Sequence, residues 1–374
     1  MTPTSLTRVV VDLEAIRHNV RLLRAHVSSR AQLMAVVKAN AYGHGAVPVA
    51  RAALQAGATW CGVASVAEGI ALRAAGIQAP ILVMSYTPLE WVEEAIQHRL
   101  SLTVFERAVV REISRRAWQL RCPARVHVEI DTGMHRLGVL PHEAQPFLAE
   151  VAALEGVVLE GVFTHLSRAD ADTEYTEAQI QTFCSAIGQV PVRYRHICNS
   201  AGVLGYPHAH LDLVRPGITL YGLSPYASST PEHPLVRALR PALSLTTSIV
   251  SLKWLPDGAW VGYGKRHQCN GHRRIAVIPV GYGDGFRYMP NHFGEVLVRG
   301  RRTPIVGAVC MDHTMLDVTD LPEVSIGDEV VLIGTQGNEC ITADEVARRW
   351  GTINYEVVTA LTARPHRVYV NAQP

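Results

Sequence analysis

The chain contains only three lysines, and one of them, Lys38, directly follows the apolar run at 33–37. An ammonium beside a buried strand is costly unless its amine is used, for example in a Schiff base or as a base of lowered pKa. The alternative is that Lys38 only ends a strand and extends into solvent. Asn40 and Gly43 tolerate unusual backbone angles, and residues 46–57 have the pattern of a helix. We therefore predict that Lys38 ends a strand, above a glycine-containing turn.

Four other polar residues also stand at the ends of apolar runs. They are Asp131, His165, Ser200 and Arg215. Ser200 precedes small residues that start a helix, where hydroxyl and N–H groups point toward an anion. In the alternative reading, His165 is a core histidine with satisfied hydrogen bonds, and Arg215 pairs with Asp212 or with a loop carboxylate. Each residue alone indicates only a strand-to-loop junction, and their shared position is what suggests a common site.

The elements that carry these residues alternate between short apolar runs and helical patterns. Eight strand-like runs occur, at 33–38, 60–65, 80–85, 101–105, 125–131, 159–165, 194–200 and 211–217. Helical patterns occur at 12–27, 46–57, 66–75, 89–98, 106–120, 141–153 and 174–188, with Asp12 as the N-cap of the first. This order favours a parallel (β/α)8 TIM barrel over residues 10–235 rather than an open doubly wound sheet. Active groups of such barrels gather where strands end, so these polar residues are expected to converge on one face.

The pattern changes near residue 236 to period-two alternation and turns. Apolar alternation marks 243–254, 275–280, 295–298 and 329–334, and one helix is predicted at 343–350 with Thr342 as its cap. We predict a mostly β C-terminal domain over 236–374, joined by the N-terminal residues 1–9. The linker-like composition of residues 228–234 supports this boundary. The expected architecture is thus an α/β barrel followed by a β-rich domain.

Composition excludes several classes of protein. The chain has 374 residues, 48% of them hydrophobic and 18% charged, which is ordinary for a globular protein of two domains. The formal net charge of +2 and the absence of long basic blocks give no indication of nucleic-acid or membrane binding. The pairs Arg273–Arg274 and Arg301–Arg302 are interpreted as solvated loop charges.

Metal and redox chemistry are not indicated either. Seven cysteines are scattered without a CxxC pair, which is typical of reduced thiols rather than of a disulfide framework or a zinc cluster. His208 and His210 have no carboxylate or cysteine at ligand spacing, so no metal is expected. The N-terminus lacks a secretory pattern, and no apolar stretch approaches the roughly 18 residues of a membrane span. We therefore expect a cytoplasmic protein.

The segment at 35–45, Ala-Val-Val-Lys-Ala-Asn-Ala-Tyr-Gly-His-Gly, resembles the pyridoxal-phosphate (PLP) lysine motif of the alanine racemases. Later segments at 129–138, 162–166, 196–202, 214–222, 261–264, 281–285, 307–313 and 353–357 resemble the same family in the same order. The resemblance implies that Lys38 binds PLP and that Arg215 faces its pyridine nitrogen. It assigns the other cofactor contacts to Tyr42, Arg136, Ser200, Gly217, Ile218 and Tyr355.

Racemisation requires a proton acceptor on each face of the substrate α-carbon. The resemblance assigns these roles to Lys38 and to Tyr263 of a partner chain in a head-to-tail homodimer. It also implies that His165, bonded to Arg215, helps Tyr263 act as a base, since a phenol ordinarily titrates near pH 10.

The substrate is expected to be alanine. By the same resemblance, Arg136 and the Met311 backbone N–H hold its carboxylate. Tyr282 and Tyr355 narrow the entrance, which excludes long side chains. The implied activity is interconversion of L- and D-alanine, with D-alanine supplied for peptidoglycan.

Two residues depart from the family pattern. Many relatives carry a lysine carbamylated by CO2 where this chain has Glu129, and the carbamate orients the arginine that corresponds to Arg136. Glutamate supplies a permanent carboxylate with a shorter reach, so we hypothesise that Glu129 orients Arg136 directly or through water. His135 stands where glycine is usual, and the sequence offers no reason for it.

Three alternatives remain open on the sequence. A serine or broad-specificity amino-acid racemase would keep the cofactor and change the pocket. A non-catalytic PLP-binding barrel would share the lysine strand but lack the domain with Tyr263 and Met311. A decarboxylase of the same fold type would use an acidic partner for the ring nitrogen, where this chain has Arg215.

Overall fold

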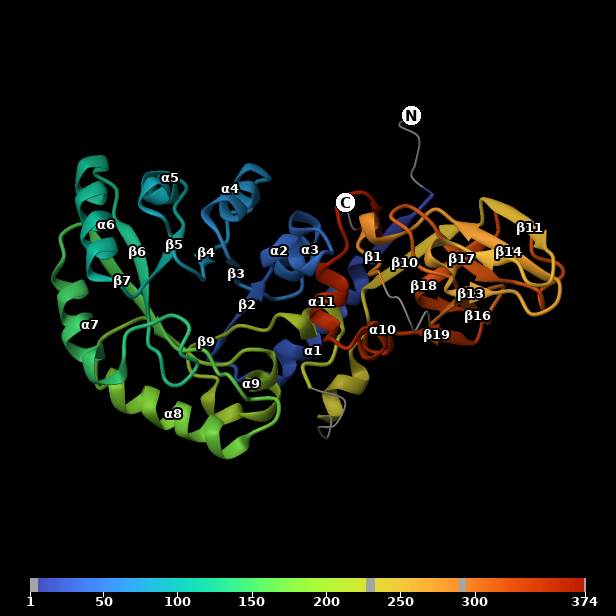
Figure 1. Ribbon diagram of the computed structural model, residues 1–374. Helices are drawn as coiled ribbons and strands as arrows, with labels where there is room; N and C mark the ends of the chain where they lie inside the picture. The colour runs from blue at the N-terminus through green and yellow to red at the C-terminus, as the bar shows by residue number, and fades with distance from the viewer. Residues whose placement is uncertain (1–5, 227–232, 289–293, 373–374) are drawn as a thin grey trace. The chain divides into compact units, whose positions relative to one another are not determined.

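The computed structural model describes residues 6–226, 233–288 and 294–372 (Figure 1). Contacts divide the chain into two compact units. The barrel unit comprises residues 14–41 and 45–241, and the β unit comprises residues 1–13, 42–44 and 242–374. Of the predicted linker 228–234, residues 228–232 lie outside the described part of the chain. None of the helices in the described ranges is long and apolar enough to cross a membrane.

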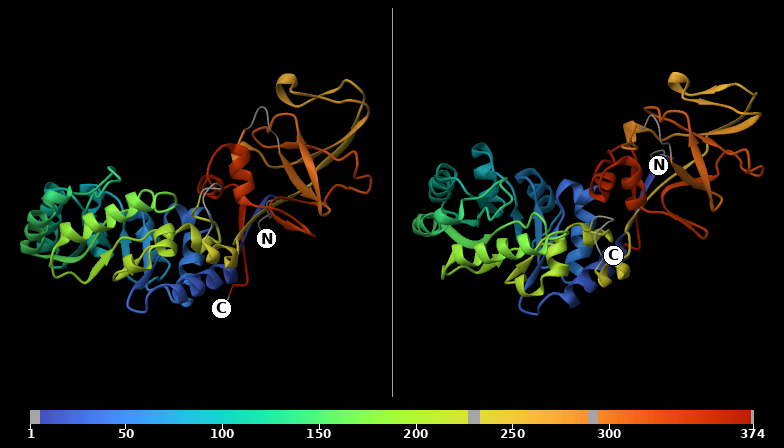
Figure 2. Two further views of the ribbon diagram at one scale, coloured as in Figure 1. Left: turned by 90° about the horizontal axis from the view of Figure 1, so that it is seen from below. Right: turned by 60° about the horizontal axis from the view of Figure 1, so that its bottom comes forward.

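The barrel unit contains a parallel sheet of eight strands with helices around it (Figure 2). The strands are β2 (Gln32–Val36), β3 (Trp60–Val63), β4 (Ile81–Val83), β5 (Ser101–Val104), β6 (Ala124–Glu129), β7 (Val157–Phe163), β8 (Tyr194–His196) and β9 (Leu213–Val214). Their order is β8-β7-β6-β5-β4-β3-β2-β9. Two backbone bonds, from Asp212 to Arg195 at 3.1 Å and from Arg215 to Cys198 at 2.9 Å, join β9 to the β8 segment and close the barrel.

Each of the eight predicted runs contains a strand because each is a short apolar segment buried between helices. The accompanying helices are α1 (Leu13–His26), α2 (Lys38–Tyr42), α3 (Ala46–Gln55), α4 (Val66–Ala74), α5 (Val92–Gln97), α6 (Arg107–Leu120), α7 (Ala144–Ala153), α8 (Thr173–Ile187) and α9 (Ser200–Gly205). One part of the barrel core is formed by Met34, Trp60, Leu82, Tyr194 and Leu213. The predicted (β/α)8 barrel is confirmed.

The β unit is built around a sheet of ten strands. These are β1 (Arg8–Asp12), β10 (Leu243–Ser248), β11 (Ser251–Leu255), β14 (Arg273–Ile278), β15 (Glu295–Val298), β16 (Arg301–Val306), β17 (Thr314–Asp317), β18 (Glu329–Gln336), β19 (Glu339–Ile341) and β20 (His366–Val370). The N-terminal strand β1 pairs antiparallel with β10 and parallel with β20. A separate hairpin is formed by β12 (Trp260–Val261) and β13 (His267–Gln268). The predicted mostly β architecture is confirmed.

Several details of the β unit differ from the sequence predictions. The predicted run 243–254 is two strands, β10 and β11. Besides α10 (Ala343–Trp350), which Thr342 caps as predicted, there is a second helix, α11 (Asn354–Thr359). Asp12 ends β1 and directly precedes α1, the position predicted for its N-cap, and its carboxylate accepts a 2.9 Å hydrogen bond from Asn371.

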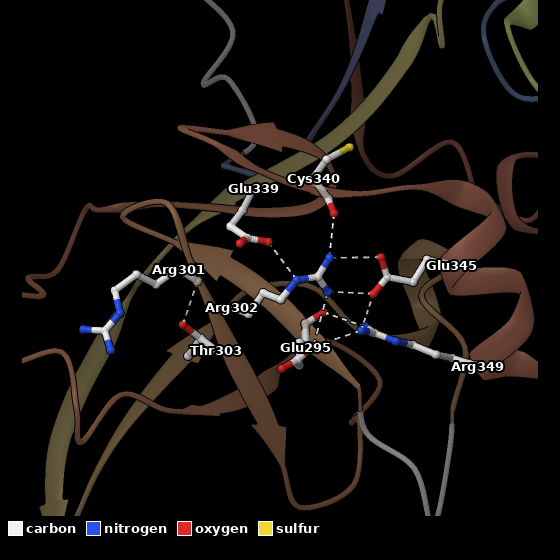
Figure 3. A network of polar contacts seen from close by, with 8 residues as sticks. All are labelled: Glu295, Arg301, Arg302, Thr303, Glu339, Cys340, Glu345 and Arg349. Atoms are coloured by element: carbon white, nitrogen blue, oxygen red, sulfur yellow. Dashed lines mark hydrogen bonds and ion pairs between the residues drawn. The ribbon is translucent and has the colours of Figure 1, made fainter. Parts of the chain in front are cut away.

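The two arginine pairs are strand residues rather than loop charges. Arg273 and Arg274 lie in β14, and Arg301 and Arg302 lie in β16. Arg302 binds three carboxylates, at 2.8 Å from Glu339, 2.7 Å from Glu345 and 3.3 Å from Glu295 (Figure 3). Each pair begins its strand, and two consecutive charged residues interrupt the alternation of apolar and polar residues by which a strand is predicted.

Candidate active site

Lys38 begins a turn of left-handed backbone. Ala39, Asn40, Ala41 and Tyr42 all have φ between 51° and 53°. This conformation costs non-glycine residues about 1–2 kcal/mol each, and only asparagine among these four tolerates it readily. The predicted glycine-containing turn is present, with Gly43 and Gly45 at φ of 82° and 103°, and the left-handed conformation also includes residues 39–42, where tertiary contacts impose it.

Glu68 supplies the contact that fixes this turn. Its carboxylate accepts hydrogen bonds from the Ala39 N–H at 2.7 Å and from the Ala64 N–H at 2.8 Å. Ser65 caps α4 by accepting a 3.3 Å bond from the Glu68 N–H. One carboxylate thus links the chain after β2 to the chain after β3, and both backbone donors are satisfied.

The environment of Lys38 lowers the pKa of its amine. Burial is the largest cause, and the positive charges of Arg136 and Arg215 act in the same direction, while Glu68 opposes them. A smaller fraction of the amine is therefore charged at neutral pH than for an exposed lysine. This favours its use as a nucleophile and as a base.

Arg215, directly after β9, is only 2% exposed. Its Nη1 donates to His196 Nδ1 at 2.7 Å, and its Nη2 donates to the carbonyls of Thr164 at 2.7 Å and Ile197 at 3.0 Å. The Nε atom is buried and has no hydrogen-bond partner among the described residues. Asp212, the alternative partner considered on the sequence, instead binds Arg195 at 2.8 Å. A buried arginine whose Nε donor has no partner among the described residues is suited to an acceptor that the chain does not provide.

His165 lies near the same positive charges but is not the histidine that binds Arg215. That role belongs to His196, so the predicted His165–Arg215 bond is not present among the described contacts. The reason is geometric, because the Nη atoms of Arg215 bind the β7 and β8 strand ends. Burial holds the pKa of His165 well below its usual range, with Arg215, Arg136 and Lys38 adding to the effect. His165 is therefore neutral.

Ser200 and Gly217 lie together, although 17 residues separate them. The Gly217 N–H donates to Ser200 Oγ at 2.8 Å, and the Thr219 hydroxyl donates to the same atom at 3.2 Å. The Gly217 N–H is therefore used inside the chain rather than pointing toward an anion. Ser200 accepts two bonds and keeps its own hydroxyl proton available for donation.

Glu129 and Arg136 line one small cavity with His165 and Thr164. No ion pair joins them among the described contacts, and Glu129 Oε2 is buried without a hydrogen-bond partner there. Burial raises the pKa of Glu129 to about 7, although Arg215 and Arg136 oppose the effect. Direct orientation of Arg136 by Glu129 is thus absent, and only an indirect route remains open.

The structure explains His135. This residue has φ of 55°, in the left-handed region that favours glycine. Asp131 compensates, because its carboxylate accepts from the His135 N–H at 2.9 Å and lies 3.1 Å from the His135 Nδ1. The hydrogen bond between the His135 side chain and Asp131 therefore offsets the backbone strain that a glycine at this position would not have.

In the β unit, the rings of Tyr42 and Tyr355 lie 6.1 Å apart. Burial raises the pKa of Tyr42 to about 12, so its hydroxyl is a donor at neutral pH. Arg367 donates to the carbonyl of Gly43 at 3.2 Å and to that of Leu361 at 2.8 Å. These contacts fix the short segment 42–44 against the C-terminal part of the chain.

Tyr263, Tyr282 and Met311 are exposed residues of the β unit. Tyr263 is 75% exposed and follows the short strand β12, whose Val261 packs in a core with Met315. Met311 is 53% exposed, and its carbonyl accepts a 2.9 Å bond from the Gly283 N–H, next to Tyr282. The Met311 N–H has no hydrogen-bond partner among the residues with described positions.

Comparison with known proteins shows which family the chain belongs to. The family model for the N-terminal domain of alanine racemases matches residues 11–225, and that for the C-terminal domain matches residues 242–369. The chain belongs to the alanine racemase family. As a member of this family it is an isomerase, an amino-acid racemase, as predicted from the sequence.

Individual relatives match the whole chain. It is 44% identical over 365 residues to the alanine racemase of Symbiobacterium thermophilum, covering 96% of each chain. It is 42% identical over 366 residues to that of Desulfovibrio desulfuricans, covering 96% of this chain and 97% of the relative. The solved structure of the Bacillus anthracis alanine racemase with bound L-Ala-P has a TM-score of 0.91 at 38% identity, covering 100% and 97% of the two chains.

The motif residues could be predicted from the sequence, but the residues that position them through hydrogen bonds could not. Lys38, Asp131, His165, Ser200 and Arg215 all come after barrel strands, as expected. Four residues that support the site were not predicted from the sequence: Glu68, His127, Glu160 and His196. Only Glu68 carried a local signal, because Ser65-Val-Ala-Glu68 has the spacing of a capping box.

Proposed function

We propose that this racemase interconverts L- and D-alanine with PLP held at Lys38. The observation that carries the proposal is the buried Arg215, whose Nε donor has no partner among the described residues. A pyridine nitrogen is an acceptor of the kind that this donor requires. When bound, PLP withdraws electrons from the substrate α-carbon and makes its proton acidic.

The residues of the chain fit such a cofactor. Ser200 has a hydroxyl proton to donate to a phosphate, and Tyr42 is a neutral phenol at physiological pH. Other contacts are proposed from Ile218, Tyr355 and Arg136, and Gly217 is proposed to contribute indirectly, since its N–H donates to Ser200. Arginine opposite the ring nitrogen cannot easily give it a proton, since its guanidinium stays charged, which limits electron withdrawal and favours return of the α-proton.

Two bases are proposed to move the α-proton. Lys38, with its lowered pKa, acts on one face. Tyr263 acts on the other face, and neutral His165 assists by orientation. The exposure of Tyr263 and Met311 in the single chain supports a homodimer in which Tyr263 of the partner chain completes the site.

Alanine is the proposed substrate. Arg136 and the Met311 N–H are proposed to hold its carboxylate, and Tyr282 and Tyr355 to limit the size of its side chain. We propose that the enzyme works in the cytoplasm and supplies D-alanine for peptidoglycan. Growth of a D-alanine-requiring bacterium after introduction of the gene tests this role.

The first experiment incubates the PLP-loaded protein with single L-amino acids in heavy water and measures chirality and α-deuterium. We expect deuterated D-alanine to appear fastest, and Lys38→Ala to abolish it. Lys253→Ala removes an exposed lysine of β11 and serves as the matched control. Faster racemisation of serine would favour the alternative substrate class, and PLP binding without α-proton exchange would contradict the racemase proposal.

A second experiment distinguishes the roles of the two proposed bases, Lys38 and Tyr263. In Tyr263→Phe we expect loss of inversion while one enantiomer still exchanges its α-hydrogen through Lys38. Loss of exchange from both enantiomers, with PLP still bound, would contradict separate roles for the two residues.

Mixing inactive variants tests the shared site. Lys38→Ala and Tyr263→Phe chains are unfolded together, refolded and assayed. If each site combines Lys38 of one chain with Tyr263 of the other, mixed dimers regain one intact site, and random pairing restores about a quarter of the wild-type sites. Absence of recovery in a mixture shown to contain mixed dimers would contradict the shared arrangement.

A further inference from the structure

A continuous chain of buried side chains runs through the barrel from Arg215. Arg215 Nη1 lies 2.7 Å from His196 Nδ1, and His196 Nε2 lies 2.8 Å from His127 Nδ1. His127 Nε2 lies 3.3 Å from Glu160 Oε2, and this series of hydrogen bonds ends there. Both histidines are 0% exposed, and Glu160 is 6% exposed.

The chemistry of the two ends fixes the direction of every bond. An arginine can only donate, so His196 Nδ1 must accept and its proton must sit on Nε2. That proton is donated to His127 Nδ1, which leaves the His127 proton on Nε2, facing Glu160. A carboxylate can only accept, which agrees with this direction. Both imidazoles are therefore neutral and aligned in one direction.

The strands place these groups side by side. His127 lies on β6, Glu160 on β7 and His196 on β8, which are neighbours in the sheet. Gly161 makes room, because a Cβ at this position would lie 2.4 Å from His127 Nδ1. The ring of Phe163 stacks on His196 at 4.8 Å. These contacts hold the two imidazoles in place.

The hydrogen-bond chain ends at a carboxylate. No carboxylate forms an ion pair with Arg215 among the described residues, so its charge is buried without a direct partner. Glu160 has its own support, since Ser101 donates to it at 2.7 Å and Arg125 at 3.3 Å. Burial alone would raise the pKa of Glu160, but the bonds from His127 and Ser101 outweigh it and lower the pKa. The carboxylate is therefore charged at neutral pH.

We propose that Glu160 is a positioning residue for Arg215. Acting through His127 and His196, it favours one direction of the hydrogen-bond chain, and so keeps His196 as an acceptor for Arg215 while the Nε donor has no partner among the described residues. The part of the proposal that concerns the cofactor rests on the proposed function, since Arg215 is there the contact of the pyridine nitrogen.

The Glu160→Gln variant tests the proposed direction of the hydrogen bonds. The glutamine carbonyl can accept the bond from His127, but its NH2 can also donate, so the variant removes both the negative charge and the requirement that His127 be the donor. In Glu160→Gln we expect PLP affinity to fall about tenfold, as for a buried charge-assisted bond that is lost, and racemisation to fall with it. Ser101→Ala keeps the charge and the direction, so it should stay near wild type.

A surface carboxylate provides the matched control. Glu150 binds Arg107 and Arg111 on the outside of the barrel unit, and Glu150→Gln should leave PLP affinity unchanged. Unchanged affinity and rate in Glu160→Gln would overturn the proposal, provided that the wild type binds PLP and racemises alanine. A wild type without either property would instead refute the proposed function.

A measurement on the wild type decides the matter even if the variant does not fold. Neutron diffraction from the protein in heavy water locates deuterons on histidine rings. We expect a deuteron on Nε2 and none on Nδ1 in both His127 and His196. A deuteron on Nδ1 of either ring would overturn the proposal.

Discussion

Glu129→Gln should stabilise the protein at alkaline pH. Glu129 is the last residue of β6, is 4% exposed, and has one carboxylate oxygen without a hydrogen-bond partner in the described structure. Burial raises its pKa from 4.5 to about 7. A buried carboxylate that must be charged above this pH costs stability, and an amide of the same shape does not have to be charged.

The magnitude and the sign follow from linkage. The difference from 4.5 to about 7 is about 2.5 in pKa, and each pKa unit corresponds to about 1.4 kcal/mol, giving about 3 kcal/mol. Because the folded state binds the proton more tightly than the unfolded state, this contribution is fully present below pH 4.5 and is lost as the pH rises to about 7. The advantage of the glutamine variant should therefore grow by about 3 kcal/mol across this window and stay constant above it.

The assay must report on the barrel alone, because a chain of two units need not unfold in one step. Hydrogen exchange in increasing urea, read on peptides that carry β6 and β7, gives the free energy of opening of the PLP-free protein. The difference between wild type and Glu129→Gln is measured from pH 4.5 to 8.5, with Glu150→Gln as the control. A difference that does not change with pH would refute the raised pKa of Glu129.

The same variant tests the proposed link between Glu129 and Arg136. If the negative charge orients Arg136 indirectly, turnover at pH 8 should fall in Glu129→Gln, and the wild type should lose activity below about pH 7 as Glu129 takes up a proton. Equal turnover of the two proteins at pH 8 would remove Glu129 from the mechanism and leave only its effect on stability.

Three further substitutions follow from single contacts. Glu68→Ala leaves the Ala39 N–H without its partner, so it should cost about 1–3 kcal/mol of barrel stability and weaken PLP binding. Glu68→Gln keeps an acceptor and should cost less, as measured by urea unfolding. Gly161→Ala forces a methyl group against His127 and should destabilise the barrel by about 1–3 kcal/mol, so an unchanged urea midpoint would contradict the packing. At position 135, alanine should be less stable than glycine by about 1 kcal/mol, because both lose the side-chain bond to Asp131 but only alanine retains the left-handed strain. Equal thermal midpoints would contradict this ranking.

The barrel could be predicted from the sequence because its strands are short apolar runs that alternate with amphipathic helices. The left-handed turn after Lys38 could not be predicted, since alanine and tyrosine do not favour that backbone. Its conformation depends on Glu68, which lies 29 residues away. In the β unit, the two-residue strands β12 and β13 are too short to show any periodicity.

The polar interior of the barrel was hidden for a different reason. His127 and Glu160 lie in strands whose other residues are mainly apolar, and a polar residue in such a strand normally faces solvent. Their burial becomes favourable only when β6, β7 and β8 lie side by side and each group meets a partner. No spacing within one strand carries that information, because the partners come from different strands.

Two cationic residues of the proposed site, Lys38 and Arg215, are therefore held by carboxylates from outside the motifs that revealed them. Glu68 fixes the backbone after Lys38, and Glu160 fixes the direction of the bonds that reach Arg215. In both cases a carboxylate, which can only accept hydrogen bonds, faces a buried donor. Without that carboxylate the donor would have no partner. A motif thus identifies which residues act, whereas the barrel determines how firmly they are held. A chain that kept every racemase motif but lost both carboxylates should still fold as a barrel and should bind its cofactor weakly.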